Sequence, residues 1–321
     1  MSQIPAVPGL GEMHAAQARL VPHVVQTPLV RLRAGNERRQ VYLKLENLQP
    51  IGAFKIRCMG NALLAANRAD LAQGVYTASS GNAGLGLAWI ARELGVPARV
   101  YAPESAPAAK LEAIRKLGAK FHRIPGEDWW QIILSGGHAD DRGKYIDAVR
   151  NTAAIAGNAT IGLEIVEAFA DVETVIVPFG GGGLASGIAA AVRAIRPDTR
   201  IIVAESDTAA PLSAAFAAGR VVDVKVETSF ISGAGAPRVL DEMWPLLREL
   251  VDDTIVVPAA SVAAAVKLLF EHNRIVAEGA GAIAVAAALS GDPGNGRTVC
   301  VVSGGNIDAA VMAAILQGQS V

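Results

Sequence analysis

Short runs of β-branched and other apolar residues alternate along this chain with longer stretches in which apolar residues recur every three to four positions. The short runs predict strands and the longer stretches predict helices, because the two spacings match the two kinds of backbone. We predict strands at 41–45, 74–77, 99–101, 174–177, 201–204 and 298–302, and helices at 83–94, 107–117, 184–195 and 261–270. Strands that alternate with helices usually form parallel sheets, so the pattern indicates an α/β fold.

The pattern also indicates a division into two domains. Residues 74–118 form a βαβα unit of their own, whereas residues 125–151 show no clear period and are interpreted as the return crossing of the chain. A chain of 321 residues is long enough for two closely packed domains. We predict a large domain made of residues 1–73 and 146–321 and a small, mobile domain made of residues 74–145.

The composition argues against several classes of protein. The net charge of −1 gives no electrostatic reason to bind nucleic acid or an anionic membrane. Cys58 and Cys300 are the only cysteines, so we expect neither a disulfide framework nor a cysteine-based zinc site. The first residues do not resemble a signal peptide, and a cytoplasmic location is expected. The uncharged stretch at 174–192 contains Pro178 and four glycines, so we interpret it as a strand, a loop and a helix rather than a membrane span.

Four segments carry the candidate chemistry. Lys55 could form a Schiff base with an aldehyde, and the four glycines at 180–183 could hold a phosphate on backbone N–H groups at the start of a helix. The turn Ser79-Ser80-Gly81-Asn82 could bind a carboxylate. Ser303 follows an apolar run and could meet a ring nitrogen. Together these segments predict an enzyme that uses pyridoxal 5'-phosphate.

Each segment also has a simpler interpretation. A lone lysine such as Lys55 is usually solvated, and Ser303 could simply be a polar residue that ends a strand. Serine and asparagine commonly cap helices, so the turn at 79–82 could do no more than start the helix predicted at 83–94. A non-catalytic α/β protein would follow if all the simpler interpretations held, but it would leave the combination of segments unexplained.

The glycine loop has a stronger alternative. Gly180, Gly182 and Ala185 fit a dinucleotide-binding fingerprint after a predicted strand, and Glu205 ends the next strand at the spacing of a ribose-binding acid. An NAD-dependent dehydrogenase is therefore the leading alternative from another cofactor class. A nicotinamide enzyme would give no role to Lys55 or Ser303, whereas a bound phosphorylated aldehyde accounts for both.

Several segments in the same order resemble those of one enzyme family. The similar segments are 27–29, 44–47, 52–57, 79–84, 155–157, 180–184, 278–281 and 303–306. In these segments the chain resembles the fold-type II pyridoxal-phosphate enzymes, in particular the serine/threonine dehydratase and serine racemase group. The resemblance implies a two-domain parallel-sheet fold of the tryptophan synthase beta and threonine dehydratase type.

The resemblance also implies roles for individual residues. Lys55 would carry the cofactor, Phe54 would pack beside its ring, and Asn82 would donate a hydrogen bond to the 3-oxygen of the ring. The phosphate would be held by the loop and the amide that follows it: Gly180, Gly181, Gly182, Gly183 and Leu184. Ser303 would face the pyridine nitrogen, and a hydroxyl there need not keep that nitrogen protonated. Such a ring is a weaker electron sink, which favours elimination of a β-substituent over transamination.

The implied reaction is the β-elimination of a 3-hydroxy amino acid, similar to serine or threonine, to a 2-oxo acid and ammonia. The substrate carboxylate would bind Ser79, Ser80 and Asn82, and Lys55 would remove the α-proton. Amino-acid racemisation, with Ser80 as a second proton carrier, is the alternative within the same family. The expected partner is a small amino-acid substrate, and the chain is expected to form a homodimer.

The chain departs from the family pattern at a few positions. Ala83 stands where many relatives have histidine, and Ala53 stands where serine is usual. In metal-dependent relatives a glutamate, a backbone carbonyl and an acidic residue hold a divalent cation; Glu205 and Ala209 match the first two, but the third position is Pro211. Because a proline side chain offers no oxygen ligand, no metal is expected.

Overall fold

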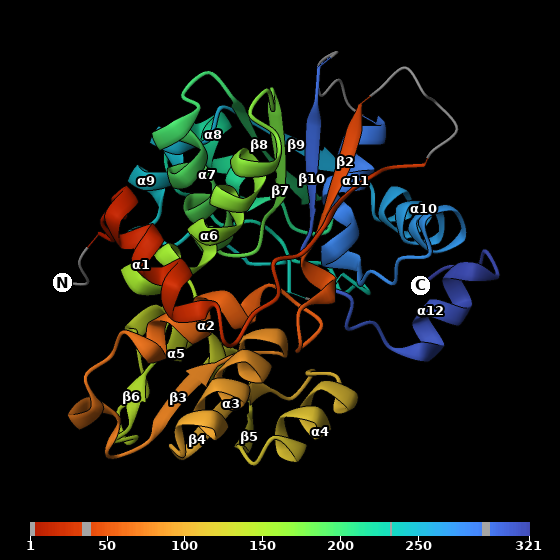
Figure 1. Cartoon of the computed structure of the whole chain (residues 1–321). Coiled ribbons are helices and arrows are strands. Elements are labelled where there is room, and N and C mark those ends of the chain that lie inside the picture. The colour runs from red at the N-terminus through yellow and green to blue at the C-terminus, as the bar shows by residue number, and fades with distance from the viewer. Residues whose placement is uncertain (1–3, 34–39, 232, 291–295) are drawn as a thin grey trace.

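The computed structural model describes residues 4–33, 40–231, 233–290 and 296–321. These residues form two lobes, each built around a β-sheet (Figure 1). The larger sheet has the strand order β1 (Leu29–Arg31), β2 (Val41–Leu45), β10 (Thr298–Val302), β7 (Thr174–Pro178), β8 (Arg200–Ser206) and β9 (Asp253–Val257). Its neighbouring strands are parallel, except that β1 is antiparallel to β2.

The smaller sheet lies in the lower lobe of Figure 1 and is parallel throughout. Its strand order is β5 (Lys120–Ile124), β4 (Ala98–Pro103), β3 (Val75–Ala78) and β6 (Lys144–Tyr145). All these strands come from the segment that the sequence predicts as the small domain. That this segment moves as a domain of its own stays a prediction.

Helices cover both faces of the larger sheet. The α-helices of the two lobes together are α1 (Leu10–Leu20), α2 (Lys55–Leu64), α3 (Asn82–Leu94), α4 (Ala108–Lys116), α5 (Gly126–Ser135), α6 (Thr152–Ala168), α7 (Gly183–Ile195), α8 (Pro211–Ala218), α9 (Trp244–Leu250), α10 (Ala259–Leu268), α11 (Gly279–Ser290) and α12 (Ala309–Leu316), of which α3, α4 and α5 pack on the smaller sheet. On β10, Val299 and Val301 join a core with α6 and α7, whereas Cys300 and Val302 join a second core with α10 and α11. This alternation follows from the two-residue period of a strand and explains why both faces of the central strands are apolar.

The strand predictions are confirmed in position and in parallel arrangement. Strands β2 and β10 have the predicted bounds, and the other predicted strands differ from the observed ones by one or two residues at their ends. The helix predicted at 261–270 begins earlier, at Ala259, and passes into a π-helical turn at Leu269–Asn273. Helix ends are set by capping and tertiary contacts, so such differences are expected.

The interpretation of residues 125–151 was wrong in part. This segment contains helix α5 and strand β6, and β6 pairs with β3, so much of it belongs to the smaller sheet rather than to a crossing. Helix α6 was not predicted, because its residues are apolar nearly all round and give no period. It is buried along most of its length, and the Asn151 side chain caps its start by accepting from the Ala154 N–H at 3.1 Å.

None of the helices in the described parts of the chain is long and apolar enough to cross a membrane.

Candidate active site

Lys55 is the first residue of helix α2, and it lies where two strands of the larger sheet end. Beyond the parallel pair β2 and β10, Ala53 forms a β-bridge with Gly304, and the Phe54 N–H donates to the Ser303 carbonyl at 3.0 Å. Lys55 and Ser303, which are far apart in the sequence, are thereby brought together. The Lys55 ammonium lies 4.9 Å from the centre of the Phe54 ring and forms no ion pair with any other described residue.

The four glycines at 180–183 form the turn between β7 and α7. Gly182 has a φ of 96°, a left-handed conformation that favours glycine. A Cβ atom at Gly180 would lie 2.7 Å from the carbonyl oxygen of Gly233, so no side chain fits there without a shift. Within the described chain, the N–H groups at 180–182 donate to no other protein group, and the first N–H groups of α7 lack partners inside the helix. Donors gathered at a helix N-terminus are a site for a phosphate.

The turn at 79–82 joins β3 to α3. The Ser79 hydroxyl oxygen accepts from the N–H groups of Gly81 and Gly84, each at 3.1 Å. This is the helix-capping role of the simpler interpretation. Ser80 and Asn82 are half-buried and line the same cavity as Lys55. The turn therefore both starts a helix and presents polar groups to the cavity.

These segments meet in one cavity of about 190 Å³ between the two lobes. Its lining includes Phe54, Lys55, Ser79, Ser80, Asn82, Gly180, Gly181 and Ser303. A smaller recess of about 60 Å³ shares part of this lining and is also formed by Gly182, Gly183 and Leu184. The structure thus brings together all the residues that the sequence analysis named for cofactor and substrate. Their roles stay predictions.

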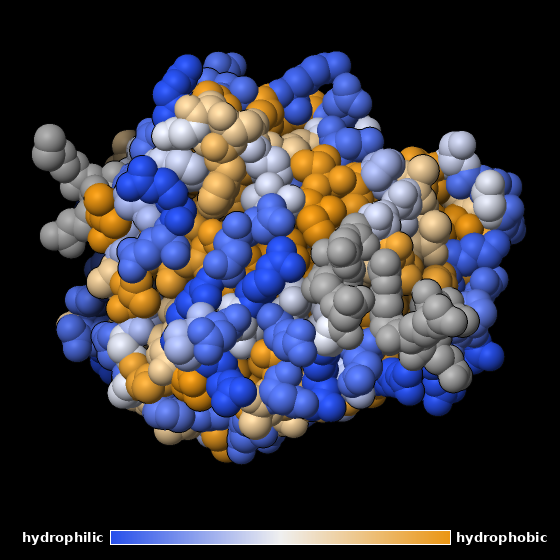
Figure 2. Space-filling model, turned by 90° about the horizontal axis from the view of Figure 1, so that it is seen from above, coloured by the Kyte–Doolittle hydropathy of each residue, from blue (hydrophilic) through white to orange (hydrophobic). Residues whose placement is uncertain are grey.

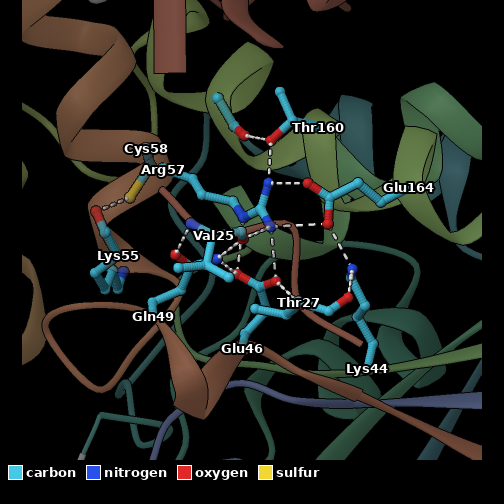
Figure 3. A network of polar contacts seen from close by, with 11 residues as sticks. Val25, Thr27, Lys44, Glu46, Gln49, Lys55, Arg57, Cys58, Thr160 and Glu164 are labelled. Atoms are coloured by element: carbon cyan, nitrogen blue, oxygen red, sulfur yellow. Dashed lines mark hydrogen bonds and ion pairs between the residues drawn. The ribbon is translucent and has the colours of Figure 1, made fainter. Parts of the chain in front are cut away.

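Arg57, two residues after Lys55, lies at the centre of a buried network of charges. Its guanidinium donates to both carboxylate oxygens of Glu46, at 2.8 and 2.9 Å, and to those of Glu164, at 2.6 and 2.9 Å. Lys44 donates to Glu164 at 2.5 Å, and Thr160 accepts from Arg57 at 3.0 Å. In Figure 3 the Lys55 side chain lies apart from this network, which we call the Arg57 network: Lys44, Glu46, Arg57, Thr160 and Glu164.

Burial acts against the charges of Lys44, Glu46 and Arg57, and the ion pairs outweigh it for Glu46 and Arg57 but not for Lys44. Burial alone would raise the pKa of Glu46, but the charge and hydrogen bonds of Arg57 hold this pKa below its usual range. Burial would likewise lower the pKa of Arg57, yet Glu46 and Glu164 raise it. For Lys44, burial prevails over the attraction of Glu164 and lowers the pKa. The Arg57 guanidinium is therefore held permanently charged.

The resemblance places Glu205 in the relatives' cation site, but here its carboxylate forms hydrogen bonds within the protein. Its side chain is fully buried, and it accepts from the N–H groups of Leu212 and Ser213 at 2.9 and 2.7 Å and from the Ser213 hydroxyl at 2.5 Å. These donors lie in the first turn of α8, so Glu205 caps that helix. Burial raises the pKa of Glu205, and the hydrogen bonds from Ser213 and Leu212 offset this only in part.

The sequence analysis assigned no role to several residues that line the cavity. Lys110 on α4, Trp129 and Trp130 on α5, and Glu278 before α11 all contribute to its wall. A signal existed for Lys110, because it lies four residues before the buried Ile114 and so shares the apolar face of its helix. Glu278 was quoted for the resemblance, but nothing in the local pattern indicated its partners.

Comparisons with known proteins agree with this geometry. Residues 20–304 match the model of the pyridoxal-phosphate dependent enzyme family. The chain is 36% identical to an L-threonine ammonia-lyase of Geobacter sulfurreducens, over 94% of this chain and 76% of that protein. It is 34% identical to the catabolic L-threonine dehydratase of Escherichia coli, over 91% of each chain. The solved structure of maize serine racemase superposes with a TM-score of 0.89 and 31% identity, covering 98% of both chains.

The family match favours pyridoxal phosphate over a nicotinamide dinucleotide as the ligand of the glycine loop. The parallel two-lobe architecture is also the one that the resemblance implied. From the site geometry and these similarities we conclude that the chain belongs to the pyridoxal-phosphate dependent enzyme family.

Proposed function

We propose that the chain is a pyridoxal-phosphate dependent ammonia-lyase that removes the β-hydroxyl group of a 3-hydroxy amino acid. The products are a 2-oxo acid and ammonia, and the water lost in the elimination is taken up again when the nitrogen is released. The observation that carries the proposal is the cavity itself, in which a lysine, a phosphate-binding turn and a strand-end hydroxyl meet. The names of relatives that are 34–36% identical to this chain over the aligned residues support it.

The residues around the cavity fit the cofactor. The N–H groups at 180–184 suit its phosphate, the Ser303 hydroxyl suits its ring nitrogen, and the Asn82 amide suits its ring oxygen. When bound, pyridoxal phosphate supplies an aldehyde that condenses with amines and a ring that accepts electron density from the α-carbon. Lys55 would hold the cofactor and would then act as the base that takes the α-proton.

Lys55 can serve as that base only in its neutral form. No carboxylate pairs with it among the described residues. Ser79, Ser80 and the N–H groups of their turn would orient the substrate carboxylate. Ser303, which is 5% exposed, would leave the ring nitrogen without a negative partner, and this favours elimination over transamination.

The test is to incubate the purified protein with pyridoxal phosphate and then with L-serine or L-threonine. We expect a yellow protein whose Schiff-base band is bleached by borohydride, and the release of ammonia and 2-oxo acid in equal amounts. A colourless protein that binds NAD instead would overturn the proposal. A yellow protein that releases no ammonia from any 3-hydroxy amino acid would overturn the elimination while leaving the cofactor in place.

Racemisation is a second candidate because Ser80 and Lys55 reach the cavity from different lobes. Two proton carriers on different sides of one carbon are what an inversion needs. If Ser80 carries the second proton, Ser80→Ala should suppress formation of the D-amino acid and leave substantial elimination. Equal loss of both activities would show that Ser80 chiefly binds the substrate.

We further propose that the chain acts as a cytoplasmic homodimer. Large apolar side chains reach the surface at Leu48 and Val276, which are 52% and 44% exposed, and the Asn47 amide donates to the Val276 carbonyl at 3.0 Å, so the two segments adjoin. On the face shown in Figure 2, hydrophobic areas also reach the surface, with hydrophilic side chains between them. Light scattering on the purified protein would test the dimer.

A further inference from the structure

Glu278 joins the two lobes at the edge of the candidate active site. It immediately precedes α11, its side chain is 5% exposed, and it lines the same cavity as Lys55. One carboxylate oxygen accepts from the Asn82 amide nitrogen at 2.5 Å, and the other accepts from the Lys110 ammonium at 2.8 Å. Asn82 and Lys110 both belong to the lobe of the smaller sheet, whereas Glu278 belongs to the other lobe.

A second contact fixes the other end of the Asn82 amide. The Asn306 amide nitrogen donates to the Asn82 side-chain oxygen at 2.9 Å and to the Ile51 carbonyl at 2.9 Å. The Ile51 carbonyl can only accept, so the nitrogen of Asn306 must face it. The Glu278 carboxylate, paired with the Lys110 ammonium, is likewise an acceptor. The donor direction is therefore set at both ends, and Asn82 has a single orientation that satisfies both neighbours.

Glycines make room for this chain of hydrogen bonds. A Cβ atom at Gly304 would lie 2.4 Å from a Glu278 carboxylate oxygen, and one at Gly81 would lie 2.5 Å from a side-chain carbon of Lys110. A Cβ atom at Gly52, whose φ is 71°, would lie 2.5 Å from the Asn306 side-chain oxygen. Each of the three polar side chains thus occupies space that any other residue at the facing position would take. The present positions of these side chains therefore depend on the facing glycines.

We propose that Glu278 is a positioning residue that aims the Asn82 amide at the cofactor ring; this rests on the proposed function. The Asn82 amide nitrogen carries two N–H groups, and Glu278 engages one of them. The second N–H is the donor that Asn82 can offer to the ring oxygen from its place in the cavity wall. Glu278 would therefore act on the cofactor through Asn82, without touching the reacting atoms.

The proposal has a spectroscopic consequence. A donor aimed at the ring oxygen stabilises the ionised oxygen, because hydrogen bonds favour the charged form that accepts them. The ionised oxygen belongs to the form of the lysine Schiff base that absorbs at longer wavelength. Loss of the aimed donor should shift the absorption of the holoenzyme toward the shorter-wavelength form and move the pH at which the two forms interconvert. A merely structural role would leave both unchanged.

Glu278→Gln is the direct test, because it keeps the shape and removes the charge. A glutamine amide can present either an oxygen or a nitrogen to Asn82, so it no longer imposes one orientation. In the holoenzyme we expect a smaller long-wavelength fraction at each pH and a kcat lower by roughly 10- to 100-fold, the usual cost of a misplaced group at an active site. Glu278→Asp keeps the charge and should retain part of the long-wavelength fraction and part of kcat.

Glu112→Gln is the matched control. Glu112 lies on α4 near Lys110, and its carboxylate pairs with Arg115 at 2.7 Å on the exposed side of the helix. The same chemical change there should alter neither the spectrum nor kcat. A shift as large as that of Glu278→Gln would mean that the spectrum responds to any loss of charge in this lobe, and the proposal would fail.

Asn306→Ala keeps the proposal testable if Glu278→Gln does not fold. It removes the other contact that orients Asn82, so it should shift the spectrum in the same direction. Unchanged spectra in whichever of the two variants folds would overturn the inference. Failure of the proposed function looks different: the wild-type holoenzyme would then show a normal Schiff-base spectrum and release no ammonia, while the effect of Glu278 on that spectrum could still be measured.

Discussion

Lys55 and Arg57 are cations two residues apart on helix α2, and the structure surrounds them in opposite ways. Arg57 is 1% exposed and contacts two carboxylates with its whole guanidinium, as Figure 3 shows. Lys55 is half-buried at a glycine-lined cavity and has the Phe54 ring as its neighbour. No carboxylate pairs with it in the part of the chain that the structure describes.

The difference shows how one helix can carry both a structural charge and the lysine proposed to react. A paired lysine would be held protonated, and a protonated amine is neither a nucleophile nor a base. An unpaired arginine at the position of Arg57 would be a buried charge without compensation, which costs several kcal/mol. The pairing of Arg57 anchors the start of the helix to Glu46, which directly follows β2, and to α6. The neighbouring Lys55 can therefore lack a counter-ion among the described residues and still be held in place.

The largest expected effect comes from removing the proposed catalytic lysine. Lys55→Ala should abolish the Schiff-base band and lower turnover by about 10⁴-fold or more, because the anchor and the base are lost together. The unfolding free energy of the cofactor-free protein should change little, because the side chain is half-buried and unpaired among the described residues. Absorption spectra, ammonia release and urea unfolding measure the three quantities. Turnover near the wild-type rate would show that Lys55 is not the catalytic lysine.

Removing the structural cation should have the reverse profile. Arg57→Met keeps much of the apolar stem but leaves Glu46 and Glu164 facing each other in the core, so we expect a loss of about 3–5 kcal/mol in unfolding free energy. Arg115→Met, which breaks the exposed pair with Glu112, is the control and should change stability little. Urea unfolding of the cofactor-free proteins measures both changes in unfolding free energy. Similar losses of unfolding free energy in both variants would show that the buried Arg57 network stabilises the protein no more than an exposed ion pair does.

Gly182→Ala tests the glycine loop that lines the recess beside Lys55. Gly182 has a φ of 96°, and a Cβ atom there would lie 2.8 Å from Leu247 Cδ1, beside the recess proposed for the phosphate. Gly219→Ala is the control, since its φ of 67° is also left-handed but nothing lies within 4 Å of the added carbon. Each change should cost about 1–2 kcal/mol of stability. Only Gly182→Ala should weaken cofactor binding, by about tenfold in a spectroscopic titration. Equal cofactor affinities in the two variants would show that the glycine loop does not bind the cofactor.

The pH dependence of stability tests the role of the counter-ion. The pKa of Glu46 lies below its usual range, so the stability it contributes is present above the ordinary glutamate pKa of about 4.3 and is lost as the pH falls through its folded value. Glu205 has a raised pKa, so its contribution is present below about 4.3 and is lost as the pH rises through the folded value.

Two Glu→Gln variants should therefore change the pH profile in opposite directions. Glu46→Gln should flatten the loss of stability on acidification, and Glu205→Gln should remove the loss that accompanies a rise toward neutral pH. A difference of one in pKa between the folded and unfolded states corresponds to about 1.4 kcal/mol, so effects near 1 kcal/mol are expected in urea unfolding at several pH values. Profiles that change in the same direction would contradict the contrast between a carboxylate paired with a cation and one capped by neutral donors.

The smallest expected effect concerns metals. Glu205 already accepts from three donors at the start of α8, and Pro211 supplies no ligand, so Mg²⁺ should not bind tightly. A ligand that does not bind the folded state cannot stabilise it, and we expect the melting temperature and activity to be insensitive to Mg²⁺ and EDTA. A saturable rise in melting temperature that Glu205→Gln abolishes would show that a cation site exists here in altered form.

Much of the fold was accessible from the sequence, but not all of it. The strands β2 and β10 were predicted with their observed bounds because both are short, mainly apolar runs that contain β-branched or aromatic residues, which favour a strand over a helix. Helix α6 was missed because a helix packed on several sides shows no polar face. Strand β6 spans only Lys144–Tyr145, which is too short to show a period, and it exists because β3 offers it hydrogen-bonding partners.

The sequence by itself determined which chemical groups this protein has: a lysine after a strand end, four consecutive glycines before a helix, and a serine ending the last strand. These are local patterns, and each could be interpreted from its own neighbourhood. Only the tertiary structure decided which charges meet. Lys110 and Glu278 are 168 positions apart, and Arg57 and Glu164 are 107 apart. Such pairs arise when elements far apart in the sequence pack together, so no periodicity along the chain could have shown that Arg57 would be paired with two carboxylates and that Lys55 would have no carboxylate partner among the described residues.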